Sequence, residues 1–158
     1  MSVAFTREED LESTAADLPD RPISQNRNLV TPEGLAAIEA ELEAARDAYN
    51  AARLAGDVST DRTAMARATR DLRYWSARRG TAELTPFEGG EVVRFGARVT
   101  FEREDGRQQT YRIVGEDEAD PNAGLVSYVA PLARALLGKS LGDTAQTSGG
   151  EVEIVAVD

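Results

Sequence analysis

The stretch that determines the fold is residues 31–84, which read TPEGLAAIEAELEAARDAYNAARLAGDVSTDRTAMARATRDLRYWSARRGTAEL. Two runs of helix-forming residues flank a short central segment, Gly56–Asp61. In both runs, steps of three and four residues place nearly all the large apolar side chains on one face of a helix. These positions are Leu35, Ile38, Leu42, Ala45, Tyr49 and Ala52 in the first run, and Met65, Ala68, Leu72, Trp75, Arg79 and Ala82 in the second.

This spacing is typical of the a/d seam of a coiled coil. The two series also mirror each other about the Val58–Ser59 bond. A chain that folds back at this bond pairs a large residue with a small one at three of the four levels nearest the turn, as knobs-into-holes packing favours. Those levels are Ala52 with Met65, Tyr49 with Ala68, Ala45 with Leu72, and Leu42 with Trp75. The sequence therefore predicts an antiparallel helical hairpin, with Tyr49 and Trp75 in its core and not on an interaction surface.

The ends of the predicted helices carry suitable residues. Thr31 suits the N-cap position, and Pro32 suits the first helical position, where a missing N–H costs nothing. Gly56 supplies a stop for the first helix, because glycine readily adopts the left-handed conformation. The second helix is expected to continue to about Leu84. Arg79 is expected to pack its stem on the seam while its charged head reaches water.

Composition excludes several classes of function. The 158-residue chain has no cysteine and no histidine, which removes thiolate metal sites, His-dependent catalytic triads and the commonest metal ligand. Its formal charge of -10 argues against direct binding to nucleic acid, which depends on basic side chains. No apolar run is long enough to span a membrane, and no signal peptide is evident. We expect a cytoplasmic protein without a cofactor or metal of its own.

Residues outside the hairpin divide into two further segments. Residues 1–30 are acidic and polar, and we interpret them as a flexible extension, with a functional arm as the alternative. Residues 86–158 change to a period of two, which indicates strands. A turn at Asp105–Gly106 predicts one β-hairpin, and Gly149–Gly150 predicts a second. The expected strands are 97–103, 108–114, 125–129, 143–147 and 151–157, with a short helix at 131–137. The expected fold class is α+β, with a coiled coil over 31–85 and an antiparallel-sheet domain over 86–158.

Several motifs in this order resemble the Gre (GreA/GreB) transcription elongation factors. The resemblance covers about residues 30–158. It rests on Thr31–Leu35, Gly56–Asp57, Phe95–Val99, Tyr111–Gly115, Asp117–Glu118, Ser127, Pro131–Lys139 and Gly149–Glu151. The family architecture is an N-terminal antiparallel coiled coil followed by an FKBP-like domain, which agrees with the pattern-based prediction.

The resemblance implies binding to bacterial RNA polymerase at its secondary channel. In this family the sheet domain docks at the channel rim, so Asp117, Pro131 and Leu132 are the implied contacts with polymerase. Acidic residues at the coiled-coil tip help to hold a catalytic Mg²⁺ of the polymerase, which then cuts backtracked RNA. Asp57 and Asp61 are the implied tip residues. The protein would be no enzyme itself, and capping and solubility are the competing roles for both aspartates.

Two departures from the family pattern leave the cleavage activity open. The family tip has Gly-Asp, two intervening residues and then Glu, whereas Thr60 occupies the second acidic place here. Each arm is also shorter than the usual family pattern by about nine residues, or roughly 13 Å of helix. A non-cleaving competitor or regulator, similar to the regulators of nucleoside diphosphate kinase, is therefore the alternative. An FKBP-type isomerase or chaperone is a further one, supported only by analogy of fold.

Overall fold

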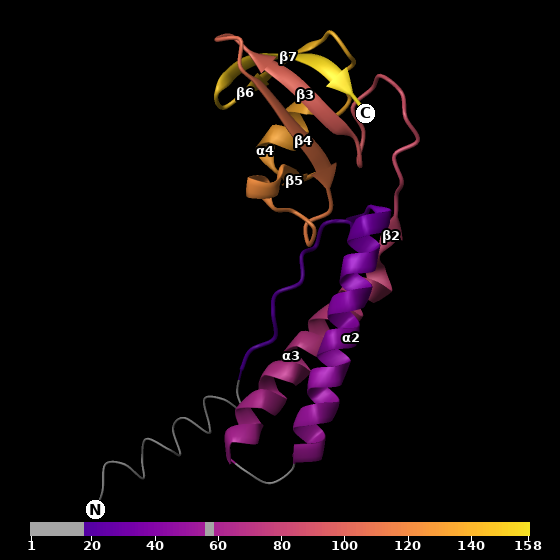
Figure 1. Ribbon diagram of the computed structural model, residues 1–158, viewed down its shortest axis with the longest axis vertical. Helices are drawn as coiled ribbons and strands as arrows, with labels where there is room; N and C mark the ends of the chain where they lie inside the picture. The colour runs from indigo at the N-terminus through magenta and orange to yellow at the C-terminus, as the bar shows by residue number, and fades with distance from the viewer. Residues whose placement is uncertain (1–17, 56–58) are drawn as a thin grey trace, which may run out of the picture. The chain divides into compact units, whose positions relative to one another are not determined.

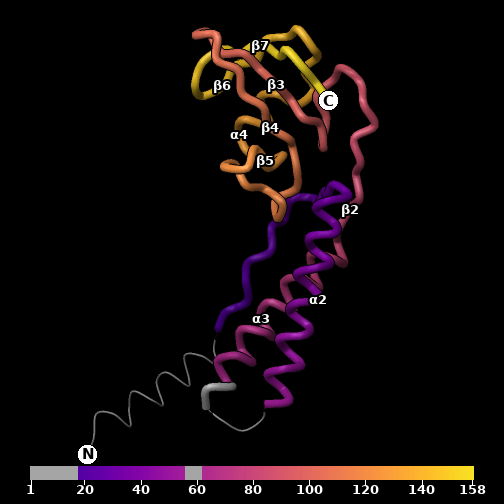
Figure 2. Tube along the Cα trace, in the orientation of Figure 1, coloured from indigo at the N-terminus to yellow at the C-terminus, as the bar shows by residue number. Residues whose placement is uncertain are grey.

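The computed structural model describes residues 18–55 and 59–158, and it divides into two compact units (Figures 1 and 2). The helical unit comprises the chain up to Asn26 together with Ile38–Thr81. The sheet unit comprises Arg27–Ala37 and Ala82–Asp158. No helix within the described residues is long and apolar enough to cross a membrane.

The helical hairpin consists of α2 (Pro32–Ala55) and α3 (Ser59–Thr81), which lie side by side in one compact unit for most of their length (Figure 2). From Leu35 to Ala55, the side chains that are not fully exposed are those of the predicted seam. Ile38, Leu42 and Ala45 are the most buried of them. The heptad prediction for this helix is therefore confirmed residue by residue.

α3 follows the prediction along most of its length but differs near its end. Ala68 is buried, and Leu72 and Trp75 are partly buried, as the seam requires. The predicted seam residue Arg79 is instead exposed and forms an ion pair with Glu39 of α2, with Nε 3.0 Å from Oε1. The neighbouring Arg78 is the buried one, with 2% of its surface exposed.

The buried face of α3 is also wider than a two-helix seam, because residues of the N-terminal segment lie against it. The Arg21 guanidinium is 3.8 Å from the centroid of the Tyr74 ring and 3.6 Å from the Asp71 carboxylate. Asp20 pairs with Arg73 at 3.2 Å. Each of these exposed pairs contributes only about 0.5–1 kcal/mol, but together they hold residues 20–21 to the helix.

α3 ends at Thr81 and not near Leu84, because the next residues form a strand. β2 (Glu83–Leu84) pairs in parallel with β1 (Leu29–Val30). Backbone hydrogen bonds from Glu83 to Asn28 and from Thr85 to Val30 extend this pairing. A two-residue strand is too short to show alternation, so the sequence pattern did not indicate it.

The sheet unit contains a five-stranded sheet in the order β5-β4-β3-β7-β6. Both predicted hairpins are confirmed. The expectation of a wholly antiparallel sheet is wrong at one pair, because β5 runs parallel to β4. The connection 115–124 is long enough to carry the chain back before β5 begins. The elements are β3 (Arg98–Arg103), β4 (Gln108–Val114), the 3-10 helix η1 (Pro121–Ala123), β5 (Leu125–Ser127), α4 (Pro131–Leu136), β6 (Thr144–Thr147) and β7 (Gly150–Val157).

The core of this unit lies between the sheet and α4. Alternate residues along β3 and β7 point into it, including the fully buried Phe101 and Ile154. α4 contributes Ala133 and Leu136, which are also fully buried. Burying a large side chain of this kind contributes roughly 1.5–3 kcal/mol, so α4 is fixed to the sheet and the strand ends next to it are held in place.

Candidate functional site

The start of α2 is joined to the loop after β4 by one buried hydroxyl. Thr31 Oγ1 accepts a hydrogen bond from the Gly34 N–H at 2.9 Å, which is the N-cap interaction that the sequence predicts. The same hydroxyl donates to Glu118 Oε1 at 2.6 Å. Thr31 is fully buried, and its contact with Gly34 is buried too, whereas its contact with Glu118 is partly buried. The cap residue and the acidic loop therefore form one structure within the sheet unit.

Gly34 has no side chain because Glu118 occupies that space. A Cβ atom at this position would lie 2.6 Å from Glu118 Oε1 and 3.3 Å from Thr31 Oγ1. Glycine is normally unfavourable within a helix by about 1 kcal/mol relative to alanine. Its presence in the first turn of α2 is explained by the close approach of the carboxylate.

An ion pair adds a second link between α2 and the sheet. Arg112 of β4 donates to Glu33 Oε2 at 3.1 Å, and its Nε donates to the Gly96 carbonyl at 3.2 Å. The pKa of Glu33 is lowered from its ordinary value, first by the residue's own backbone N–H and then by Arg112. The carboxylate of Glu33 is therefore held in its charged form beside the first turn of the helix, where the helix dipole also favours negative charge.

The segment before α2 lies close against the sheet unit. A Cβ atom on the buried Gly115 would collide with the carbonyl oxygen of Leu29. Tyr128 donates its hydroxyl to the Arg27 carbonyl at 2.6 Å, and its ring packs edge-on against Phe95. These contacts hold β1 in place.

The predicted docking residues follow the ends of two neighbouring strands. β4 and β5 are parallel, with Val114 opposite Ser127, so the segments that follow them leave the sheet at the same edge. Asp117 lies in the first of these segments and is partly buried. Pro131 and Leu132 begin α4 after the second segment.

Pro131 and Leu132 differ in exposure. Pro131 is exposed at the first position of α4, where it also serves the helix start. Leu132 is partly buried and packs against the hydrophobic core. Pro131 is therefore accessible to a binding partner, whereas packing against the core fixes the orientation of Leu132.

The structure does not test the two predicted tip residues. Asp57 lies outside the described residues, and only the backbone of Asp61 is described, in the first turn of α3. Their assignment stays a prediction.

The connection between Thr31, Gly34 and Glu118 was not predicted from the sequence. Thr31 is a recognisable helix cap and Glu118 belongs to a motif, but no sequence pattern relates residues so far apart in the chain. The signal that was available is the glycine in the first helical turn, which costs stability unless another group needs the space.

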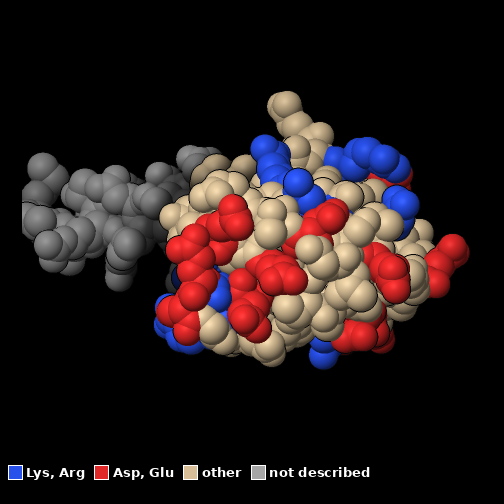
Figure 3. All heavy atoms as spheres, turned by 90° about the horizontal axis from the view of Figure 1, so that it is seen from above, with Lys and Arg blue, Asp and Glu red and all other residues tan. Residues whose placement is uncertain are grey.

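Acidic side chains gather over a broad part of the face shown in Figure 3, and basic ones are grouped towards its edges. This distribution agrees with the formal charge of -10. Such a face attracts basic surfaces and repels polyanions.

Comparison with known proteins identifies relatives of both units. Residues 88–158 match the family described as "Transcription elongation factor, GreA/GreB, C-term". A transcription elongation factor GreA of Hyphomonas neptunium is 37% identical over 137 residues, which cover 75% of this chain and 87% of that protein. A GreA of Anaeromyxobacter sp. is 47% identical over 85 residues, where the match spans about half of each protein, 52% and 51%.

Two solved structures share a lower sequence identity with this chain. The crystal structure of GreA factor homolog 1 from Thermus thermophilus is 22% identical, with a TM-score of 0.39, and the match covers 84% of this chain and 99% of that one. A GreA/GreB factor from Nitrosomonas europaea has a TM-score of 0.38 at 22% identity, over 82% of this chain and 97% of that one.

Proposed function

The chain belongs to the GreA/GreB family of transcription elongation factors, and we propose that it binds bacterial RNA polymerase at the secondary channel and regulates elongation. The observation that carries this proposal is the similarity to the Hyphomonas GreA, which extends over 87% of that protein. Because polymerase works in the cytoplasm, we place the protein there too.

Within this proposal the sheet unit docks on the polymerase through Asp117, Pro131 and Leu132. Their position supports this role, because the segments after β4 and β5 leave the sheet at one edge. The partly buried Thr31–Glu118 hydrogen bond fixes the start of α2 to the loop that contains Asp117. The contact residues are therefore preorganised, which lowers the entropy lost on binding.

The hairpin is the arm that enters the channel, with Asp57 and Asp61 near its tip. A carboxylate is a hard oxygen ligand suited to Mg²⁺, which activates water for phosphodiester hydrolysis. In this role the metal and the reaction belong to the polymerase active site, and the factor has no cofactor of its own. RNA cleavage would then be stimulated but not performed by this chain.

A non-cleaving regulator is the second candidate, and two observations favour it. Thr60 stands where the family has its second tip acid. α2 and α3 have 24 and 23 residues, which corresponds to arms of only about 35 Å at the helical rise. A short arm with one acid in place would occupy the channel without supplying the full ligand set.

Two measurements test the proposal in sequence. A pull-down with core polymerase is expected to capture the full chain, and no capture at micromolar concentration would refute the function. Addition to stalled, backtracked complexes then separates the two candidates. A cleavage factor should release short 3′ RNA fragments, and Asp57→Ala should abolish this release. Asp47→Ala removes the same charge away from the tip, so it should still release fragments. A non-cleaving regulator should release no RNA fragments but should compete with an active GreA for the polymerase.

A further inference from the structure

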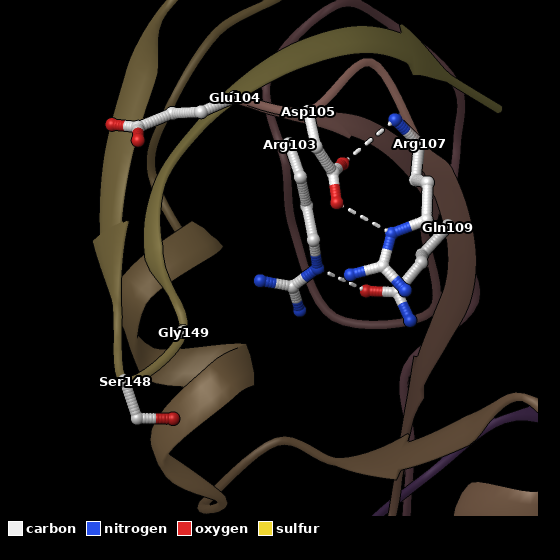
Figure 4. Close-up of a pocket in the computed structure, with 7 residues that line it drawn as sticks. All are labelled: Arg103, Glu104, Asp105, Arg107, Gln109, Ser148 and Gly149. Carbon is white, nitrogen blue, oxygen red and sulfur yellow. Dashed lines mark hydrogen bonds and ion pairs between the residues drawn. The ribbon is translucent and has the colours of Figure 1, made fainter.

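A hollow of about 530 Å³ lies between the ends of two hairpins in the sheet unit (Figure 4). One wall is the β3–β4 turn, and the other is the β6–β7 turn. The two turns meet because β3 pairs with β7, with Arg103 opposite Val152. The lining residues are Arg103, Glu104, Asp105, Arg107, Gln109, Ser148 and Gly149. This hollow is distinct from the docking residues discussed above.

Arg103 is held in a fixed orientation at the centre of this hollow. Its Nε donates a hydrogen bond to Gln109 Oε1 at 2.6 Å, and its guanidinium carbon lies 5.4 Å from the centroid of the Phe101 ring. The side chain is partly buried. Because Gln109 is a neutral partner, it orients the guanidinium without cancelling the positive charge.

The outer edge of the guanidinium faces the Ser148–Gly149 turn. Figure 4 shows one terminal nitrogen of Arg103 directed toward this turn. A Cβ atom at Gly149 would lie 2.6 Å from Nη1 and 3.7 Å from Nη2. The absence of a side chain at Gly149 therefore leaves room for the fork of two N–H groups.

The acidic residues of the hollow do not neutralise Arg103 directly. Asp105 accepts hydrogen bonds from the backbone N–H of Arg107 at 3.0 Å and from its Nε at 2.7 Å. These contacts, the backbone one first, lower the pKa of Asp105, so its charge is satisfied mainly by Arg107. Glu104 points away from the other side chains in Figure 4.

We propose that this hollow binds a single carboxylate from an acidic side chain of a protein partner, held by Arg103 Nη1 and Nη2 with Ser148 as an additional donor. A guanidinium fork matches the planar carboxylate and binds it in a bidentate manner. A more highly charged ligand is disfavoured by Asp105 and Glu104 at the rim and by the formal charge of -10. Carboxylate binding in this hollow does not depend on polymerase binding.

The test is an NMR titration of the isotope-labelled full chain with two short peptides. One is the blocked peptide acetyl-Gly-Glu-Gly-amide, and the other carries Gln in place of Glu as a neutral match. We expect saturable shifts of the Arg103 Nε–H and Gly149 N–H signals with the Glu peptide alone. Equal shifts with the Gln peptide, or none with either, overturn the proposal.

A charge-preserving variant makes the test specific to the fork. Gly149→Ala places a methyl group where Nη1 now lies, so the guanidinium must move although no charge changes. We expect it to weaken binding of the Glu peptide by about tenfold, as loss of a hydrogen bond to a charged group does. Gly80→Ala on α3, where a methyl group meets nothing within 4 Å, is the matched control and should bind normally.

Arg103→Lys keeps the charge but loses the planar fork, and it should weaken binding to a similar extent. Unchanged affinity in both Gly149→Ala and Arg103→Lys would refute the role of Arg103. A parallel titration with inorganic phosphate tests the ligand class: tighter binding of phosphate than of the Glu peptide would overturn the assignment to a carboxylate.

Discussion

At the scale of single residues, the hydroxyl of Thr31 has two tasks in one buried position. It accepts from the Gly34 N–H and donates to Glu118 Oε1. Glu118 is partly buried. A partly buried carboxylate that loses such a donor is not fully compensated by water, so this loss costs more than the loss of an ordinary exposed contact. The joint between α2 and the acidic loop is thus sensitive to the loss of one oxygen atom.

Thr31→Ala tests this joint. It removes both the helix cap and the donor to Glu118, so we expect the free energy of unfolding to fall by about 2 kcal/mol. Urea denaturation measures the change. Thr31→Ser keeps the hydroxyl and should recover most of the loss. Thr144→Ala, at an exposed strand position, is the control, and a loss there as large as in Thr31→Ala would contradict the argument.

The Arg112–Glu33 pair gives a prediction for pH dependence. The pKa of Glu33 is lowered in the folded state, so its charged form contributes stability above the unfolded-state pKa. That contribution is lost as the pH falls through the lowered value. In Arg112→Gln the backbone N–H remains, so the Glu33 pKa should rise only part of the way toward its ordinary value of 4.5.

An NMR titration that follows the Glu33 side-chain carboxyl measures this shift. Arg107→Gln, which removes an exposed arginine at the turn of the β3–β4 hairpin, far along the strand from Arg112, should leave the Glu33 pKa where it is. An identical Glu33 pKa in the wild type and Arg112→Gln would show that the ion pair contributes nothing.

At the scale of elements, β1 depends on the absence of a side chain at Gly115. A methyl group there would collide with the Leu29 carbonyl, and backbone cannot move aside as readily as a flexible side chain. We expect Gly115→Ala to destabilise the sheet unit by about 2 kcal/mol, the usual cost of overpacking. Thermal unfolding would detect this loss. Gly80→Ala should be neutral or slightly stabilising, and a similar loss in both variants would point to a general effect of replacing glycine.

The elements show which parts of the fold were predictable. The seam of α2 follows from heptad spacing, because a pattern that repeats over about five helical turns leaves few alternatives. Both β-hairpins follow from alternation and turn glycines. By contrast, β1 and β2 are two-residue strands whose pairing depends on contacts between distant parts of the chain. The heptad pattern of α3 also gives no sign that Arg78 is buried in place of the predicted seam residue Arg79.

The same limit applies to the candidate site. Local chemistry predicts Thr31 as a helix cap, and the family resemblance predicts Asp117 and Pro131 as contact residues. The hydrogen bond between Thr31 and Glu118 could not be predicted, because no shared periodicity relates these two residues. Gly34 and Gly115 were the local hints, since a glycine at a costly position commonly marks the close approach of another group.

At the scale of the whole molecule, the proposed cleavage role would place two separate requirements on the hairpin, one on arm length and one on tip chemistry. Thr60 occupies the place of the second family acid, and the two helices of 24 and 23 residues set the reach of the arm. Restoring the acid alone would not help if the tip stops short of the active centre. Lengthening the arm alone would deliver an incomplete set of carboxylates.

Thr60→Glu with one added heptad in each arm meets both requirements. An added heptad extends a helix by about 10 Å and preserves the a/d seam, provided that both insertions lie at the level where Ala45 is expected to face Leu72. We expect this combined variant to cleave backtracked RNA faster than the wild type and than Thr60→Glu alone. Gel analysis of released 3′ fragments measures the rates. A heptad added to α2 alone shifts the pairing between α2 and α3, so this variant should not cleave faster than Thr60→Glu. If Thr60→Glu by itself matches the combined variant, the natural arm already reaches the active centre, and its length does not limit cleavage.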